Sequence, residues 1–267
     1  MSNKQICFIS HGGGPLPLLQ PKNNQQMIDT LLQIRKLLTR PKAILVISAH
    51  WEASRPTITA GKNPQLIYDY SGFPDAAYHI EYPCRGEPQL AQALYKALNR
   101  AGLNPVLDEA RGFDHGLYVP LKILYPDADI PCVQLSLLDS LNAQKHIALG
   151  EVLAGLDFEN LLIIGSGFSF HNMRAFFSDE GDKERQYNID FENWLVQTLS
   201  DMAITEDERR LRLTDWLKVS PAARYNHPRE EHLLPLHVCY GAAQSACDKF
   251  YRLQILTKQT SMYVWYQ

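Results

Sequence analysis

Four short, continuously apolar runs constrain the fold of this chain most strongly. Each has the length and the β-branched content of a strand, and they are "ICFIS" (6–10), "AILVIS" (43–48), "PCVQLS" (131–136) and "NLLIIGS" (160–166). Strands that are apolar on both sides are typical of a parallel sheet covered on both faces. The runs therefore predict the buried strands of one central sheet.

Helix-like segments alternate with these runs. Residues 25–38, 86–102 and 140–156 carry apolar residues near helical spacing, and the second begins near Pro88 and ends at Gly102. Alternation of strands and helices predicts an α/β domain with a mostly parallel or mixed central sheet flanked by helices on both faces. The segment 249–267 predicts a pair of strands that closes one sheet edge.

The charge-rich segment 178–220 differs from the rest and predicts a helical insertion. It contains two amphipathic stretches, and in the second Thr205 and Glu208 have the spacing of a capping box. We expect these helices to form a hairpin packed on the sheet. No internal repeat or linker is evident, so the whole chain, 1–267, is predicted to form one domain.

The composition argues against several classes of partner and compartment. The net charge of −3 and the absence of a polybasic stretch predict neither a nucleic-acid partner nor a membrane partner. No run approaches the roughly 18 apolar residues of a membrane span, and the N-terminus lacks the apolar core of a signal peptide. Five scattered cysteines without a C-x-x-C pair predict reduced thiols in a cytoplasmic protein. The oligomeric state is left open.

Histidines follow three of the apolar runs. His11 comes after the first, His50 after the second and His171 after the fourth. Ligands of open α/β sheets gather at the carboxyl ends of the strands. A single buried histidine is more often bonded to backbone, but three in the same position favour a functional site. Glycines 12–14 leave room beside His11, although an ordinary tight turn has the same composition.

Two further segments add histidines. "RGFDHGLYVPL" (111–121) places His115 in a turn before a predicted helix. "HPREEHLLPLHVCYGAA" (227–243) carries His227, His232 and His237, and its Pro228 resembles the first turn of a helix. Taken alone, His227 fits a turn residue and His237 a half-buried helix residue.

The acids beside His232 allow two interpretations. Glu230 or Glu231 either orients the imidazole or is simply solvated. Neutral imidazoles bind zinc, iron and copper, and the cysteines do not share the histidine pattern, so a structural zinc finger is not favoured. We expect His11 to be a metal ligand.

A serine hydrolase is a rival interpretation of "HGGG" (11–14), because this motif occurs in oxyanion holes of lipases and esterases. That fold also needs a G-x-S-x-G elbow. The nearest match, "GFSFH" (167–171), ends in His171 instead of glycine, so the hydrolase interpretation is not favoured.

Together these segments resemble the class III extradiol ring-cleavage dioxygenases (LigB-like), and specifically the DOPA 4,5-dioxygenase-like branch. The matching segments occur in family order and span nearly the whole chain. They are "SHGGGP", "SAHWE", "IYDYSGFPDAAYHIEYP" (67–83), "RGFDHGLYVPL", "GSGFSFHN" and "HPREEHLLPLHVCYGAA".

The resemblance implies one divalent metal held by His11, His50 and His232. Fe(II) would serve activity, and Zn(II) is also described in this branch. It implies His171 as the catalytic base or a fourth ligand, and His115 as a second-sphere catalytic histidine. The implied substrates are O₂ and a small aromatic diol, a DOPA-like catechol opened to a semialdehyde. His232 stands where many non-haem iron sites have a carboxylate.

Three aromatic residues are candidate walls for the substrate ring: Tyr118, Trp51 and Phe168. Each of them also fits ordinary core packing, and Tyr118 stands where many relatives carry tryptophan. A zinc-dependent hydrolase and a non-enzymatic Memo-like binding protein on the same scaffold are the alternatives to a dioxygenase.

Overall fold

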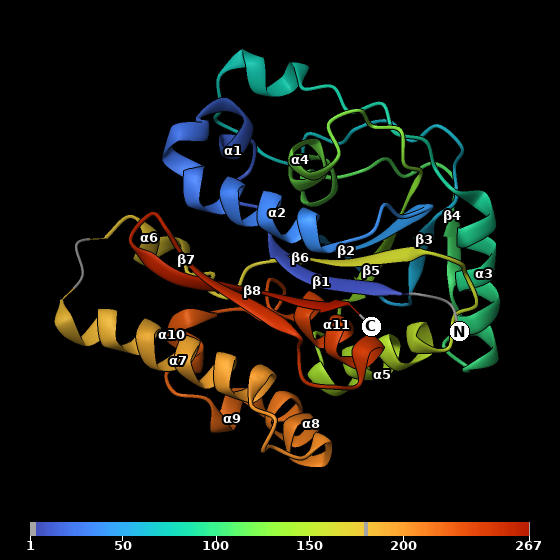
Figure 1. Cartoon of the computed structure of the whole chain (residues 1–267). Helices are drawn as coiled ribbons and strands as arrows, with labels where there is room; N and C mark the ends of the chain where they lie inside the picture. The colour runs from blue at the N-terminus through green and yellow to red at the C-terminus, as the bar shows by residue number, and fades with distance from the viewer. Residues whose placement is uncertain (1–3, 179–180, 267) are drawn as a thin grey trace.

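The computed structural model describes residues 4–178 and 181–266, and in them eight strands form one mixed sheet (Figure 1). The strand order is β4-β3-β5-β2-β6-β1-β8-β7. The bounds are β1 (Gln5–Ser10), β2 (Ala43–Ala53), β3 (Thr57–Thr59), β4 (Val106–Asp108), β5 (Cys132–Leu138), β6 (Leu161–Gly167), β7 (Lys249–Ile255) and β8 (Lys258–Tyr266). The four apolar runs form the adjacent central strands β5, β2, β6 and β1, which are all parallel.

The outer strands are partly antiparallel. β8 pairs antiparallel with β1, β7 pairs antiparallel with β8, and β3 pairs antiparallel with β5. The expected strand pair at the end of the chain is thereby confirmed, except that residue 267 lies outside the described residues. The sheet is mixed because a tight turn after β7 reverses the chain, whereas parallel neighbours need a longer crossover.

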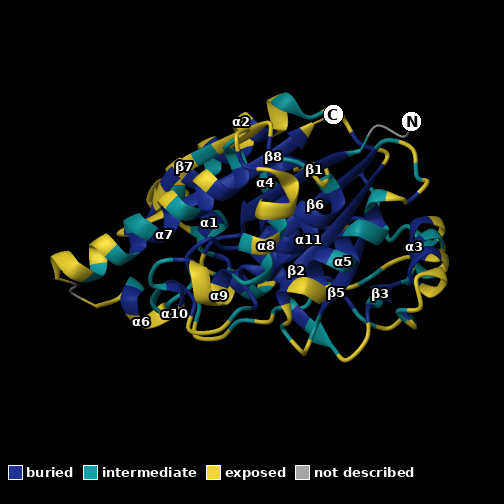
Figure 2. Ribbon diagram, turned by 90° about the horizontal axis from the view of Figure 1, so that it is seen from below, coloured by how far each residue is buried: buried dark blue, intermediate teal, exposed yellow. Residues whose placement is uncertain are grey.

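Alternating side chains of the central strands supply two apolar layers. On β1, Ile6 and Phe8 join one core cluster and Cys7 and Ile9 join the other. Successive residues of a strand point to opposite faces, so a strand that is apolar throughout fills both layers. Figure 2 shows the sheet strands as buried beneath helices whose outer faces are exposed.

Helices cover both faces of the sheet (Figure 1). One face carries α1 (Leu16–Leu19), α2 (Gln25–Leu37) and α4 (His115–Leu124). The other carries α3 (Pro88–Arg100), α5 (Ala143–Ala154), α7 (Asp182–Ser200) and α11 (Leu234–Ala243). The short turn η1 (Pro21–Asn24) joins α1 to α2, and η2 (Asp75–His79) lies between β3 and α3. The predicted α/β class is confirmed, and α2, α3 and α5 lie within the expected helical segments.

The helix expected from Pro228 begins instead at Leu234, so that expectation was wrong. Residues 228–233 form turns. Pro235 fits the first turn of α11, where its missing N–H needs no acceptor, and this sets the start of the helix. His232 therefore lies in a turn outside the helix.

The insertion contains two longer helices, α7 and α8 (Glu206–Thr214), followed by the short helices α9 (Trp216–Val219) and α10 (Ala223–Asn226). Residues 179–180 of the predicted insertion lie outside the described residues. Thr205 caps α8, because its side chain accepts from the Glu208 N–H at 3.3 Å. α7 packs against β8 on the sheet, whereas α8 contacts the helices α5 and α7, so of this pair α7 lies directly on the sheet. Among the described residues, none of the helices is both long and apolar enough to span a membrane.

Candidate active site

Five histidines meet at the carboxyl end of the central strands. His11 follows β1, His50 lies near the end of β2, and His171 follows β6 and precedes α6 (Met173–Phe176). His115 opens α4, and His232 lies in the turn before α11. All five line one cavity of about 410 Å³, so the sheet edge predicted from the sequence does gather these side chains.

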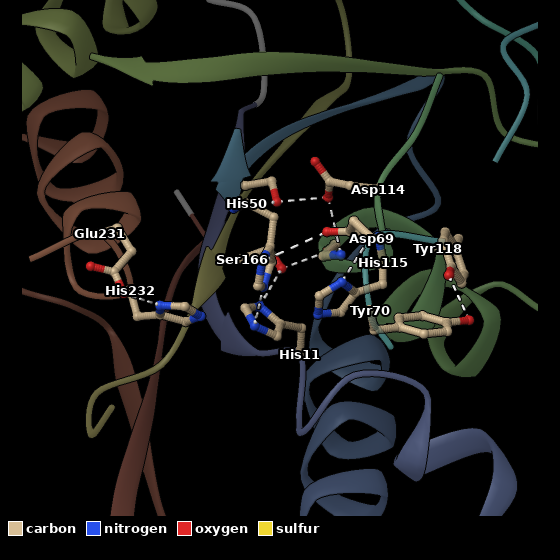
Figure 3. A network of polar contacts seen from close by, with 12 residues as sticks. His11, His50, Asp69, Tyr70, Asp114, His115, Tyr118, Ser166, Glu231 and His232 are labelled. Carbon is tan, nitrogen blue, oxygen red and sulfur yellow. Dashed lines mark hydrogen bonds and ion pairs between the residues drawn. The ribbon is translucent and has the colours of Figure 1, made fainter. Parts of the chain in front are cut away.

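The three expected metal ligands lie together in the site (Figure 3). The Nε2 atoms of His11 and His50 are 3.0 Å apart. The ring centroid of His232 lies 5.3 Å from that of His11 and 5.0 Å from that of His50. One nitrogen of each imidazole falls within 4.8 Å of the others, a spacing that one ion can bridge.

The Nδ1 atoms of these three rings each face an oxygen. His11 Nδ1 lies 3.1 Å from Ser166 Oγ, and this hydroxyl donates its own proton to the Gly116 carbonyl. The hydroxyl must therefore accept from His11, which puts the ring proton on Nδ1. His232 Nδ1 lies 2.9 Å from Glu231 Oε1. His50 Nδ1 lies 3.7 Å from Asp69 Oδ2.

This arrangement fits a divalent cation. A proton held on Nδ1 leaves the lone pair on Nε2, and an outer oxygen partner of this kind is usual for metal-binding histidines. Because His11 carries its ring proton on Nδ1, its Nε2 has a lone pair that faces His50 Nε2 at 3.0 Å. A cation between these two nitrogens would be bound by both once the His50 proton lies on Nδ1. Asp69 and Glu231 supply two negative charges behind the rings, which match the charge of one divalent ion.

The electrostatics keep the imidazoles neutral. Burial, followed by repulsion from the neighbouring imidazoles, holds the pKa of His11 and of His50 well below the ordinary value. Burial and then His171 lower the pKa of His232 to about 4. Burial opposes ionisation of Glu231, but hydrogen bonds from His171 and His232 hold its pKa far below the usual range. Neutral imidazoles beside an ionised carboxylate are the forms that bind metal.

Glu231 also joins His171 to the site. The His171 ring stacks on His232 with centroids 3.4 Å apart and planes 14° apart. Its Nδ1 lies 3.3 Å from Glu231 Oε1, the oxygen that His232 also contacts. One acid beside His232 therefore does orient an imidazole, and it orients two.

Asp69 makes the corresponding link on the other side. Its Oδ1 accepts from His115 Nδ1 at 2.9 Å and from the His115 N–H at 3.0 Å, while its Oδ2 faces His50. The rings of His115 and His50 have centroids 3.9 Å apart. Burial alone would raise the pKa of Asp69, but the hydrogen bond from His115 lowers it. Each carboxylate thus bridges one expected ligand and one expected catalytic histidine.

Two glycines allow the chain to pass this closely. Gly12 has φ of +80°, and a Cβ there would collide with Pro17. A Cβ on Gly116 would collide with Ser48 Oγ, which donates to the N-cap residue Asp114 at 2.7 Å. The turn after β1 and the start of α4 therefore require glycine at these positions. Gly12, Gly13 and Gly14 all line the cavity.

The aromatic residues expected as substrate walls separate into two kinds. Phe168 lines the cavity, edge-on to His11 with centroids 6.3 Å apart. Trp51 lies outside the cavity lining and is covered by the Arg111 guanidinium, 4.3 Å from the ring centroid. Tyr118 also lies outside that lining and donates from its hydroxyl to that of Tyr70 at 2.9 Å (Figure 3). Tyr70 itself borders the cavity.

Sequence reasoning missed three residues of the site: Asp69, Tyr70 and Ser166. Ser166 carried a usable signal, because a hydroxyl inside an otherwise apolar strand needs a partner. Asp69 and Tyr70 lie in a loop, where nothing in their spacing marks them. Ser169, the only serine of the weak hydrolase elbow, is fully buried and accepts from the Ser261 N–H at 2.8 Å, so it is not exposed as a nucleophile.

The comparisons with known proteins agree with this geometry. The family model of the catalytic LigB subunit of aromatic ring-opening dioxygenase matches residues 5–264. The dioxygenase tasH of Hapsidospora irregularis is 40% identical over 257 residues, covering 89% of this chain and 78% of that protein. A 4,5-DOPA dioxygenase extradiol of Beta vulgaris is 36% identical over 241 residues, covering 90% and 87%.

A solved structure shows the same fold. The crystal structure of an uncharacterized Escherichia coli K12 protein superposes with a TM-score of 0.75 at 28% identity, covering 98% of this chain and 99% of that one. The family model and the relatives both span most of the chain. The chain therefore belongs to the LigB family of aromatic ring-opening dioxygenases.

Proposed function

We propose that this ring-opening dioxygenase is a metal-dependent extradiol enzyme acting on a small catechol. It would add both atoms of O₂ to the substrate and open the ring beside its hydroxyls, giving a semialdehyde. One observation carries the proposal: two carboxylates each bridge a pair of imidazoles, and the His11, His50 and His232 nitrogens converge at the end of a cavity.

His11, His50 and His232 would hold one divalent metal. Three protein ligands leave open positions for a substrate, as catalytic metal sites require. Bound Fe(II) would supply the one-electron chemistry by which O₂ reacts with a catechol, whereas Zn(II) would fill the same ligands without redox chemistry. The Nδ1 partners Ser166, Asp69 and Glu231 fix how the three rings face the ion.

His171 is proposed as the base. Its Nδ1 faces Glu231, so Nε2 is the nitrogen free to take a proton from a catechol hydroxyl in the cavity. The negative charge of Glu231 stabilises the imidazolium that results. The alternative role, a fourth metal ligand, would use the same Nε2 atom.

His115 is proposed to serve the oxygen chemistry from outside the ligand set. Asp69 accepts from its Nδ1 and its N–H, which fixes the ring and leaves Nε2 facing the cavity. That atom can exchange a proton or a hydrogen bond with an oxygen of the bound substrates. Its position at the start of α4 keeps this nitrogen on a rigid element.

The cavity supports a single aromatic ring with a side chain. Tyr70 and Phe73, edge-on to each other with centroids 5.4 Å apart, border one part of it, and Phe168 borders another. Relatives named 4,5-DOPA dioxygenase support a DOPA-like catechol, a ring with one substituent. The five cysteines are buried and free of disulfides, which supports a cytoplasmic setting.

Anaerobic loading with Fe(II), followed by oxygen-uptake measurements over a panel of catechols, tests the proposal. We expect one O₂ consumed for each catechol lost and a product that gains the mass of O₂. Zinc-loaded protein should bind the same catechols without consuming O₂. The proposal would be wrong if the iron-loaded protein left every catechol intact and the zinc-loaded protein hydrolysed esters. The protein would then be a zinc hydrolase.

A further inference from the structure

The cavity continues outward from the histidines along an apolar wall. Phe168 lies edge-on to His11 at 6.3 Å and edge-on to Phe176 at 5.7 Å, so apolar contacts begin at the expected ligands. We call this part of the lining the apolar arm; it consists of Phe168, Met173, Phe176, Phe177, Ile255 and Leu256. The residues come from the end of β6, from α6 and from the turn after β7.

The outer end of the apolar arm is exposed. The exposed fractions of Phe177, Met173 and Leu256 are 76%, 55% and 52%. Large apolar side chains that border a cavity and remain in contact with water are stabilised when an apolar group covers them. The arm is therefore suited to an apolar extension of a molecule whose ring lies at the histidines.

The described cavity lining contains no lysine or arginine that could pair with a negatively charged group of a substrate. Every lysine and arginine of the chain falls within the described residues, and none lines the cavity. The remaining polar lining away from the histidines is uncharged: Gln20, Asn23, Asn24 and Ser71. Arg229 is paired with Glu52 and Glu231, and Arg111 with Asp114.

A substrate carboxylate lying in the arm would lose hydration against apolar side chains without gaining a cationic partner. An amide or hydroxyl can hydrogen-bond to a carboxylate, but leaving a charge unpaired in an apolar setting is strongly unfavourable. DOPA carries a carboxylate and an ammonium on its ring substituent.

From these contacts we propose that the substrate is a catechol whose ring substituent is uncharged and apolar, an alkyl or aryl chain, and not an amino acid. This inference rests on the proposed catechol-cleaving function and names the substrate class of the same site. The apolar arm determines specificity, because each methylene it covers should improve binding about fourfold.

A series of catechols with the same chain length tests the inference. The probes are 4-propylcatechol, 3-(3,4-dihydroxyphenyl)propanoate, dopamine and DOPA. Two measurements are made on each: kcat/KM with iron-loaded protein, and Kd by calorimetry with zinc-loaded protein, where no turnover interferes. We expect 4-propylcatechol to exceed DOPA by roughly 10²-fold in both, because a covered methyl replaces the carboxylate and no charge is left unpaired. Dopamine should show whether the amine or the carboxylate is the disfavoured group.

A charge placed in the arm sharpens the test. Met173→Arg should improve Kd for the propanoate roughly 10-fold relative to 4-propylcatechol, because it supplies the missing cation. Met202→Arg is the matched control, since Met202 is 84% exposed and lies outside the cavity lining, and it should leave the ratio unchanged.

The outcomes separate the two proposals. If DOPA binds and turns over as well as 4-propylcatechol, the inference is overturned and the catechol-cleaving function stands. If the iron-loaded protein cleaves none of the four, the proposed function fails and the inference fails with it. If Met173→Arg and Met202→Arg gave the same ratio of Kd values for the propanoate and 4-propylcatechol, the apolar arm would not determine specificity.

Discussion

Two groups of histidines in this protein have different hydrogen-bonding partners. The cavity group consists of His11, His50, His115, His171 and His232. The framework group, buried among the helices, consists of His146, His227 and His237. In the cavity group Nδ1 faces a side-chain oxygen, whereas the framework rings contact backbone groups.

The backbone contacts of the framework group use the nitrogen that a ligand would need. His146 Nδ1 lies 2.8 Å from the Asn142 carbonyl, and its Nε2 accepts from the Leu138 N–H at 3.0 Å. His227 Nε2 donates to the Ser169 carbonyl at 2.6 Å. His237 Nε2 lies 3.0 Å from the Leu213 carbonyl. A buried imidazole is therefore free for chemistry only when an outer side chain holds one nitrogen and leaves the other facing a cavity.

Removing two members of the cavity group should have the largest effect. In His11→Ala/His50→Ala, metal content should fall from about one ion per chain to near zero, and ring cleavage should be lost. Elemental analysis of the folded protein measures this. His146→Gln, from the framework group, should keep its metal. If the double variant contained as many metal ions per chain as the native protein, the cavity group would not be the metal site.

His171→Ala should separate a base from a ligand within the cavity group. As a base, its loss should leave metal near one ion per chain and lower turnover roughly 10²- to 10⁴-fold. Part of that loss should return at high pH, where catechol ionises without help. A pH–rate profile and metal analysis of the same variant decide the question. Weakened metal binding without rescue at high pH would make His171 a fourth ligand.

Glu231→Gln should weaken metal affinity roughly 10- to 100-fold, because an outer partner of a metal-binding histidine contributes on this scale. Glu231 Oε1 holds both His171 and His232. Glu230→Gln is the matched control: Glu230 pairs with Arg224 and touches no histidine of the cavity group. Competition with a metal chelator measures both affinities. An equal loss in the two variants would mean that charge alone, and not ring orientation, is responsible.

The smallest expected effect concerns the framework group. It is an effect of pH on the free energy of unfolding, and not on turnover. Burial lowers the pKa of His146 to about 4, whereas the unfolded chain takes up this proton near 6.5. The unfolded state therefore binds more protons between these values, so stability falls as pH drops from about 6.5 to 4 and levels off below.

For this one residue the loss is about 3 kcal/mol. His146→Gln, which keeps a donor and an acceptor, should remove it from denaturant unfolding curves measured across this pH range. The exposed His79→Gln should not change the curves. Parallel pH dependence in the native protein and His146→Gln would show that burial does not shift this imidazole.

The sheet was predictable from the sequence because its strands are apolar throughout. A run such as 43–48 can be buried on both faces only between other strands and under helices, so the α/β class and the central strands follow from local pattern. The C-terminal strand pair was also predicted from its segment of sequence. The start of α11 was placed wrongly, since 228–233 and 234–243 share helix-forming residues and only Pro235 marks the boundary.

The site was predictable in part. His11, His50 and His171 were placed at one edge because strand ends of a parallel sheet converge there. Trp51 follows His50 in β2 and so points to the opposite face of the strand, outside the cavity lining. Tyr118 lies one turn after His115 in α4, but it contacts the cavity through Tyr70 and does not line it.

The sequence by itself determined the layers of the fold, the edge of the sheet at which the imidazoles gather and, through its ordered motifs, the family. Only the tertiary structure decided which imidazoles are free for chemistry. "HPREEHLLPLH" holds His227, His232 and His237 within one turn and one helix start, and only His232 reaches the cavity. The difference depends on the Ser169 and Leu213 carbonyls, which packing brings to His227 and His237, whereas Glu231 holds Nδ1 of His232. The local pattern encodes the neighbouring Glu231 but not the two distant carbonyls.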